Sequence, residues 1–359
     1  MNKLNDINSL ARLTVQELTA YQSARKIGGT GTVWLNANEA PQTPCDELSL
    51  GDAKFNRYPE PQPSKLIARY ADYAGLNPTQ VLATRGGDEG IELVIRTFCE
   101  PTDSIVICPP TYGMYAISAK TAGVGVIEVM QTPSFGLDLD GIAKAMDTQA
   151  VKVVFVCSPN NPTGNVLPER ELTALFELCA GRAMVVLDEA YIEYAQKSYV
   201  SQLAEYPHLA IIRTLSKAFG LAGLRCGFVL ANSQVIELLS KVIAPYPIAV
   251  PVVVLAEQAL SPSGIAKMQQ AVLQTLAEKQ RLASELKTLP SVEQVFDSET
   301  NYLLVRFNDS PKVFEQLWQA GIILRHQHHN PMLENCIRIT VGSVSENDAL
   351  LNQLRTVLL

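Results

Sequence analysis

Short apolar runs alternate with helix-like segments between residues 81 and 231, and this alternation is the strongest constraint on the fold. Each run is too short for a buried helix, and most are followed by proline or a polar residue. Apolar strands with helices between them are typical of a mainly parallel sheet that is covered on both faces. The predicted strands are residues 81–84, 105–108, 124–129, 151–157, 184–187, 209–212 and 228–231.

The pattern changes after residue 247, where a long helical region at 251–289 predicts a connection to a smaller α+β unit. Strands are expected there at 302–307 and 337–340, with a helix at 311–320 between them. We therefore expect an N-terminal arm at 1–31 that joins the small domain, and a large domain at 32–247. A linker helix and the small C-terminal domain should occupy 248–359.

Helix ends are predicted from capping residues. Ser64 should cap a helix that runs to residue 74 and stops at Gly75. Ser345 should open the last helix, with Asp348 three residues later in a capping-box arrangement. Other helices are expected at 86–99, 112–122 and 168–180, with a short helical piece near 7–18 and a short strand at 33–36.

Composition excludes several classes of protein. The chain of 359 residues is 47% apolar and 18% charged, which is ordinary for a globular enzyme-sized chain. Its net charge is −7 and its basic residues are scattered, so nucleic acid and anionic membranes are not expected partners. Seven scattered cysteines without a Cys-x-x-Cys pair indicate a reducing compartment, and no signal core or membrane span is visible. We expect a cytoplasmic protein.

One stretch, residues 213–228, concentrates reactive side chains within apolar sequence. A partly buried Lys217 amine would lose solvation, which lowers its pKa and makes it a nucleophile and base. Thr214, Ser216 and Arg225 are groups that bind phosphate. A reactive lysine beside a phosphate site indicates pyridoxal 5'-phosphate (PLP), held as a Schiff base. The alternative is a surface loop with an ordinary lysine.

Three further loops follow predicted strands and should converge with the lysine at the carboxyl edge of the sheet. Residues 86–90 open a helix whose free N–H groups can bind an anion, although a plain helix start would look the same. Residues 158–164 place two asparagines between prolines, which also suits a simple turn. Asp188 leaves an apolar strand and could pair with a pyridinium N–H, or could simply cap a turn.

Three motifs, in their order along the chain, resemble the signature of the fold-type I PLP-dependent aminotransferases: Asn161-Pro-Thr-Gly164, Asp188-x-x-Tyr191, and Ser216-Lys217 with Arg225. Further stretches across nearly the whole chain are similar to the histidinol-phosphate aminotransferase family. They are Tyr21–Arg25, Leu35–Glu39, Arg57–Pro59, Arg85–Gly90, Arg213–Phe219 and Cys336–Gly342. The resemblance implies the aspartate aminotransferase-like fold, with a mainly parallel sheet in a large domain and a smaller α+β domain.

The resemblance also implies roles for individual residues around PLP. Lys217 would bind the cofactor covalently and then carry the proton, while Asp188 pairs with the pyridine nitrogen. Tyr191 and Asn161 would hydrogen-bond its phenolic oxygen, and Tyr112 would stack on its ring. The phosphate would be held by Thr214, Ser216, Arg225 and the backbone of Gly87, Asp88 and Glu89.

Substrate binding and assembly follow from the same resemblance. Arg338 would bind the anionic group of the substrate, with Arg325, Tyr21 and Asn36 nearby. A planar arginine can hold either the phosphate ester of histidinol phosphate or the carboxylate of the acceptor, 2-oxoglutarate. Tyr58 would reach the phosphate of the other subunit, which implies a homodimer.

Two positions depart from the family pattern, since Ala40 replaces an asparagine and His326 replaces a commoner acidic residue. The histidines at 326, 328 and 329 lack the acid or cysteine partners of a metal site, so we predict a polar loop and no metal.

Other functions stay open on sequence alone. A PLP lyase such as a threonine-phosphate decarboxylase would use the same scaffold, and an aromatic amino-acid aminotransferase would differ mainly in substrate. A non-catalytic binding protein is the least favoured alternative, because it gives no function to Lys217 and Asp188.

Overall fold

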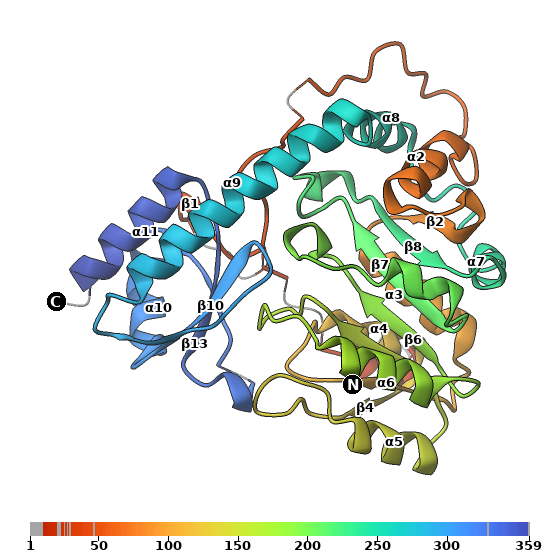
Figure 1. Cartoon of the computed structure of the whole chain (residues 1–359), viewed down its shortest axis with the longest axis horizontal. Helices are drawn as coiled ribbons and strands as arrows, with labels where there is room; N and C mark the ends of the chain where they lie inside the picture. The colour runs from red at the N-terminus through yellow and green to blue at the C-terminus, as the bar shows by residue number, and fades with distance from the viewer. Residues whose placement is uncertain are drawn as a thin grey trace, which may run out of the picture.

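The computed structural model describes residues 10–19, 23–24, 26, 28, 30–45, 47–328 and 330–357. A seven-stranded sheet, called here the large sheet, has the order β2-β8-β7-β6-β5-β3-β4 (Figure 1). Only β8 runs against its neighbours, so the predicted mainly parallel sheet is confirmed. Its strands are β2 Val81–Thr84, β3 Ser104–Ile107, β4 Gly125–Glu128, β5 Val151–Cys157, β6 Met184–Asp188, β7 Leu209–Thr214 and β8 Gly227–Ala231.

Helices cover both faces of the large sheet because successive strand residues point to opposite sides. In β5, Val154 and Val156 enter one core, whereas Val153 and Phe155 enter the other. Helices α2 Ser64–Ala74, α5 Leu139–Thr148 and α6 Glu169–Cys179 pack on the first face, and α3 Gly87–Phe98, α4 Met114–Ala122 and α7 Ser233–Ser240 on the second.

A smaller antiparallel sheet, called here the small sheet, has the order β12-β13-β10-β9 and its own core. Its strands are β9 Val292–Val295, β10 Tyr302–Phe307, β12 Arg325–His326 and β13 Cys336–Thr340, accompanied by α10 Ser310–Gln319 and α11 Val344–Val357. The segment β1 Val33–Trp34, far away in sequence, pairs in parallel with β11 Ile322–Ile323 beside this sheet. Residues 33–34 are therefore paired with a segment of the C-terminal part of the chain.

The helical region predicted at 251–289 is present, but it is divided into two helices. Helix α8 spans Val250–Ala259 and α9 spans Pro262–Leu286. The break falls where Ser261 caps α9 by accepting the Gly264 N–H, and where Pro262 has no N–H to continue α8. In Figure 1, α9 crosses from the large sheet to the small one.

Two predicted caps are wrong. Helix α2 does begin at Ser64, but the Ser64 N–H is bound by the Glu60 carboxylate, and Pro63 is the capping position. The capping box of α11 lies two residues earlier than predicted, with Ser343 and Glu346 each accepting the other's backbone N–H. Within the described residues the N-terminal piece is helical only at α1 Leu13–Gln16. Elements α5, α7 and β9 were not predicted.

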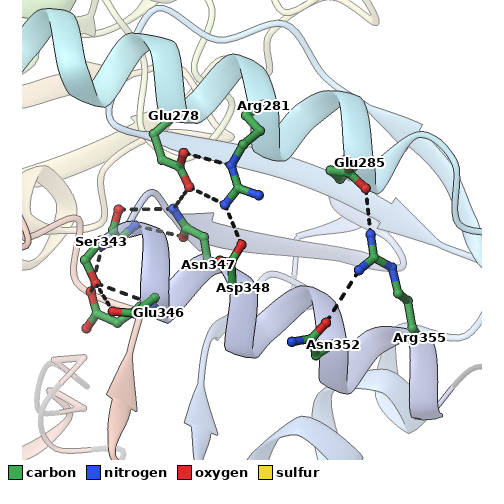
Figure 2. Close-up of polar contacts among 11 residues, drawn as sticks. Glu278, Arg281, Glu285, Ser343, Glu346, Asn347, Asp348, Asn352 and Arg355 are labelled. Atoms are coloured by element: carbon green, nitrogen blue, oxygen red, sulfur yellow. Dashed lines mark hydrogen bonds and ion pairs between the residues drawn. The ribbon is translucent and has the colours of Figure 1, made fainter.

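A polar network joins α9 to α11 (Figure 2). Arg281 binds Glu278 on its own helix and Asp348 on α11, and Asn347 donates to Glu278. Arg355 donates to Glu285 one turn farther along α9. These groups are partly exposed, so each pair contributes about 0–1 kcal/mol, but together they fix α11 on the second half of α9. No helix in the described ranges is long and apolar enough to span a bilayer.

Candidate active site

A cavity of about 440 Å³ opens at the carboxyl edge of the large sheet. Strands β2, β5, β6 and β7 all end at this edge, and the antiparallel β8 begins there, which explains how distant loops converge. Twelve of the predicted site residues line the cavity: Gly87, Asp88, Tyr112, Asn161, Asp188, Tyr191, Thr214, Ser216, Lys217, Arg225, Arg325 and Arg338.

Lys217 lies in the turn after β7 with its amine inside the cavity. Its Nζ donates to the Ala37 carbonyl at 3.2 Å and lies 5.5 Å from the centre of the Tyr191 ring. Burial and, to a lesser extent, the positive charge of Arg338 together lower the pKa of Lys217 to about 8. A useful fraction of this amine is therefore neutral and nucleophilic near neutral pH.

Asp188 is the last residue of β6 and is only 5% exposed. The Tyr115 hydroxyl donates to its Oδ2 at 2.7 Å, and the Ala190 N–H donates to its Oδ1 at 3.0 Å. Burial raises the pKa of Asp188 to about 6, while these hydrogen bonds oppose that rise. An acid that lines a cavity in this way fits a partner with an N–H group and positive charge, such as a pyridinium nitrogen.

A cluster of hydrogen-bond donors surrounds the start of α3. Thr214 Oγ1 lies 2.9 Å from Ser216 Oγ, and Arg225 Nη1 lies 3.5 Å from the same oxygen. No side chain caps α3, so its first N–H groups are open to a ligand. Gly86 has a φ of 82°, a backbone conformation that side chains with a Cβ rarely adopt, so this position favours glycine. Hydroxyls, a guanidinium and helix N–H groups together fit a phosphate ester.

Asp88 and Glu89, both at the start of α3, have different surroundings. The Asp88 carboxylate accepts from the Tyr112 hydroxyl at 3.0 Å and pairs with Arg225 at 3.4 Å, at the cavity wall. The Glu89 carboxylate instead binds the backbone N–H and the side chain of Arg85, and Glu89 does not line the cavity. The Glu89 carboxylate is therefore occupied by Arg85, which leaves the Glu89 backbone for the predicted phosphate contact.

Two arginines lie side by side at the opposite wall. Arg325 of β12 is the direct antiparallel partner of Arg338 of β13. Arg338 donates to Asn161 Oδ1 at 2.6 Å and to the Asn36 carbonyl at 2.7 Å, and within the described part of the chain no carboxylate pairs with it. Like charges on facing strand positions are destabilising without a counter-ion. Arg338, which has no carboxylate partner in the described residues, is therefore a candidate to bind an anionic ligand group.

Besides Glu89, two described residues from the prediction, Asn36 and Tyr58, do not line the cavity. Asn36 is fully buried and reaches the site only through its carbonyl, which orients Arg338. Tyr58 is 82% exposed and stacks on Tyr246 with ring centres 4.6 Å apart. Tyr21 lies outside the described residues.

Comparison with known proteins identifies the family. Residues 30–354 match the family described as aminotransferase class I and II. The chain belongs to this family. This aminotransferase is 56% identical over 352 residues to histidinol-phosphate aminotransferase 1 of Pasteurella multocida strain Pm70, covering 98% of this chain and 99% of that protein.

Solved structures confirm the predicted fold class of the aminotransferase. Histidinol-phosphate aminotransferase from Sinorhizobium meliloti, in complex with pyridoxal-5'-phosphate, superposes with a TM-score of 0.87 at 23% identity and covers 98% of both chains. A mutant aspartate aminotransferase of Thermus thermophilus gives 0.77 at 22% identity, over 95% of this chain and all of that one. The enzymes of this family depend on PLP and act on small molecules.

Sequence reasoning missed two residues that hold the aminotransferase site from behind. One is Tyr115, whose position one helical turn after Tyr112 was the available signal. The other is Asn38, which donates to the Tyr191 hydroxyl at 2.9 Å from a left-handed backbone conformation with φ 54°. Asparagine is among the few non-glycine residues that adopt this conformation readily.

Asn38 also connects the two sheets of the aminotransferase. Its backbone N–H donates to Thr340 Oγ1 at 3.0 Å, and its carbonyl accepts from Asn301 Nδ2 at 3.0 Å. Thr340 ends β13 of the small sheet, whereas Tyr191 follows β6 of the large sheet. A single buried side chain thus joins the catalytic edge of one sheet to the other.

Proposed function

We propose that this aminotransferase moves the amino group of L-histidinol phosphate to 2-oxoglutarate, giving imidazole acetol phosphate and L-glutamate in histidine biosynthesis. The observation that carries the proposal is 56% identity to a histidinol-phosphate aminotransferase over nearly the full length of both chains. The site geometry supports it, since an amine, a buried acid and two arginines line one cavity.

We assign PLP to this cavity. PLP supplies the electron sink that makes the substrate Cα–H acidic. The phosphate would lie against Thr214, Ser216, Arg225 and the start of α3, and the Asp188 carboxylate would hold the pyridine nitrogen protonated. Tyr112 would cover the ring, with Tyr191 and Asn161 at its phenolic oxygen.

The catalytic work of the protein falls mainly to Lys217. Once the substrate amine has replaced it, the Lys217 amine is free to take the proton from the substrate Cα and to return a proton on the way to product. Its pKa of about 8 suits both directions of transfer near neutral pH. Asp188 keeps its negative charge at the far end of the site.

Arg325 and Arg338 would bind the two substrates in turn. The amino donor presents a phosphate ester and the acceptor presents a carboxylate, and a guanidinium can bind either with paired hydrogen bonds. Asn161 and the Asn36 carbonyl hold Arg338 in place. Tyr21 is proposed to complete this end of the site.

We further propose that the enzyme is a homodimer in which Tyr58 reaches the phosphate site of the partner subunit. The exposure of Tyr58 and of the neighbouring Phe55 supports this assignment. The seven cysteines form no disulfide among the described residues, which supports a reducing location, the cytoplasm. The separate cores of the two sheets support a large domain at 32–247, a linker and small domain at 248–359, and an arm at 1–31 that joins the small domain.

The test is glutamate formation from L-histidinol phosphate and 2-oxoglutarate by the purified holoenzyme. Lys217→Ala should lower turnover by about 10²- to 10⁴-fold or more, whereas Lys241→Ala, an exposed lysine on the end of α7, should leave it unchanged. Carbon dioxide release from phosphothreonine without an acceptor would instead establish a lyase. Faster turnover of phenylalanine than of histidinol phosphate would establish an aromatic aminotransferase.

A further inference from the structure

Tyr115 lies directly behind Asp188 and is locked in the core. It is a residue of α4 with no solvent exposure. Its ring stacks on Phe155 of β5, with centres 4.9 Å apart and planes at 14°, and meets the edge of Tyr112 at 5.7 Å. The ring cannot turn aside without opening the core, so the direction of its hydroxyl is fixed.

The Tyr115 hydroxyl donates a hydrogen bond to Asp188 Oδ2 at 2.7 Å. With the Ala190 N–H on Oδ1, each carboxylate oxygen receives one donor from the protein. Each oxygen keeps further lone-pair capacity for a ligand in the cavity. Two donors from two different elements also fix the plane of the carboxylate.

Charged and titratable groups face Asp188 from several elements. Lys217 after β7 favours the ionised acid, while Asp88 on α3 disfavours it. The Cys157 thiol lies at the end of β5, paired in register with Asp188, and burial keeps this thiol protonated. Tyr115 provides the largest effect that opposes desolvation of the carboxylate, because its hydrogen bond lowers the pKa of Asp188.

We propose that Tyr115 is a positioning residue that keeps Asp188 ionised and aims it at the pyridine nitrogen of the cofactor. The inference rests on the role proposed above for Asp188. If Asp188 were protonated, the oxygen that carries the proton could not accept a hydrogen bond from a protonated pyridine nitrogen. Loss of the Tyr115 hydroxyl should therefore weaken cofactor binding and move the acid limb of the activity profile to higher pH.

Tyr115→Phe tests this inference in the holoenzyme, because it removes the hydroxyl and leaves the ring stack. We expect the dissociation constant of PLP to rise about tenfold, as for loss of a hydrogen bond to a charged group. The acid limb of the kcat/KM profile should move to higher pH by about one pH unit. Tyr70→Phe is the matched control, since Tyr70 is equally buried, stacks on Phe228 and does not line the cavity.

A Tyr115→Phe enzyme with the PLP affinity and the pH profile of the Tyr70→Phe control would overturn the inference. Should the variant fold poorly by circular dichroism, 3,5-difluorotyrosine at position 115 gives a second test, because a more acidic phenol is a stronger donor. It should move the acid limb to lower pH, and no movement would contradict us. Asp188→Asn, measured in parallel, separates the two proposals. If it keeps wild-type PLP affinity, the role of Asp188 fails, whereas if it alone loses PLP, only the Tyr115 inference fails.

Discussion

At the residue scale, burial shifts the pKa values of both Lys217 and Asp188 away from their ordinary ranges. The cavity removes water from both, which lowers the pKa of the amine to about 8 and raises that of the acid to about 6. Each is thereby brought closer to neutral pH, where it can exchange or share protons. Desolvation of this kind costs stability, so the site is maintained by the surrounding packing.

The pH dependence of Lys217 in the apoenzyme follows from its lowered pKa. Because only the neutral amine attacks an aldehyde, the rate of PLP capture should rise with pH around a midpoint near 8. At pH 7 about a tenth of this amine is neutral, against less than about one in a thousand for an ordinary lysine. Stopped-flow absorbance of PLP binding at several pH values measures the midpoint.

Lys279 provides the matched comparison, because burial lowers its pKa to about 8 as well. Its amine is bound to the carbonyls of Ser298 and Thr300 and does not line the cavity. Lys217→Ala should abolish covalent capture after borohydride reduction, while Lys279 should stay unlabelled. A midpoint above about 10 would contradict the buried-amine assignment.

Sequence alone located the cavity-lining residues that belong to contiguous motifs, such as those around Asp188 and Lys217. It could not locate Tyr115 or Asn38, because their importance lies in contacts with residues far away in the chain. Asn38 meets Tyr191, Asn301 and Thr340 only after both sheets have formed.

At the element scale, the hydrophobic pattern found every strand of the large sheet but stopped short at the site. Strand β6 continues to Asp188 and β7 continues to Thr214, because these polar residues still occupy ladder positions beside β5 and β8. Apolar periodicity ends where the functional residues begin, so the strands look shorter in the sequence than they are. Ser261 and Pro262 mark the break before α9 in the sequence. The break was missed because the helical pattern continues on both sides of these two residues.

The capping box of α11 gives a prediction about stability. Ser343→Ala should lower the free energy of unfolding by about 1 kcal/mol, because it removes the acceptor of the Glu346 N–H. Urea denaturation of the apoenzyme measures this change. Ser345→Ala is the matched control within the same turn and should cost clearly less. A larger loss for Ser345→Ala would show that the box lies where the sequence pattern placed it.

At the scale of the whole molecule, the proposed dimer predicts complementation between subunits. Tyr58→Ala and Lys217→Ala should each lower activity in separate homodimers. In a mixed dimer, the subunit that carries Tyr58→Ala keeps its own Lys217 and receives an intact Tyr58 from its partner. Unfolding and refolding the two variants together should therefore restore activity above the sum of the parts.

Two results would contradict this arrangement. If Tyr58→Ala alone keeps wild-type PLP affinity and turnover, Tyr58 has no part in the site. If co-refolded variants form mixed dimers by mass spectrometry but stay inactive, Tyr58 acts within its own chain. The organisation into two sheets was predictable from the change in sequence pattern after residue 247. The proposed dimer was not predictable in this way, because subunit contacts depend on surface residues that hydrophobic periodicity does not describe.

The position of Asn38 links the surroundings of Tyr191 to the relative position of the two sheets. Its amide steadies the phenol of Tyr191, while its backbone is anchored to Thr340 and Asn301. A displacement of β13 away from the large sheet would draw this amide off the phenol and leave Tyr191 without its donor. The orientation of the Tyr191 hydroxyl therefore depends on contact between the large and the small sheet.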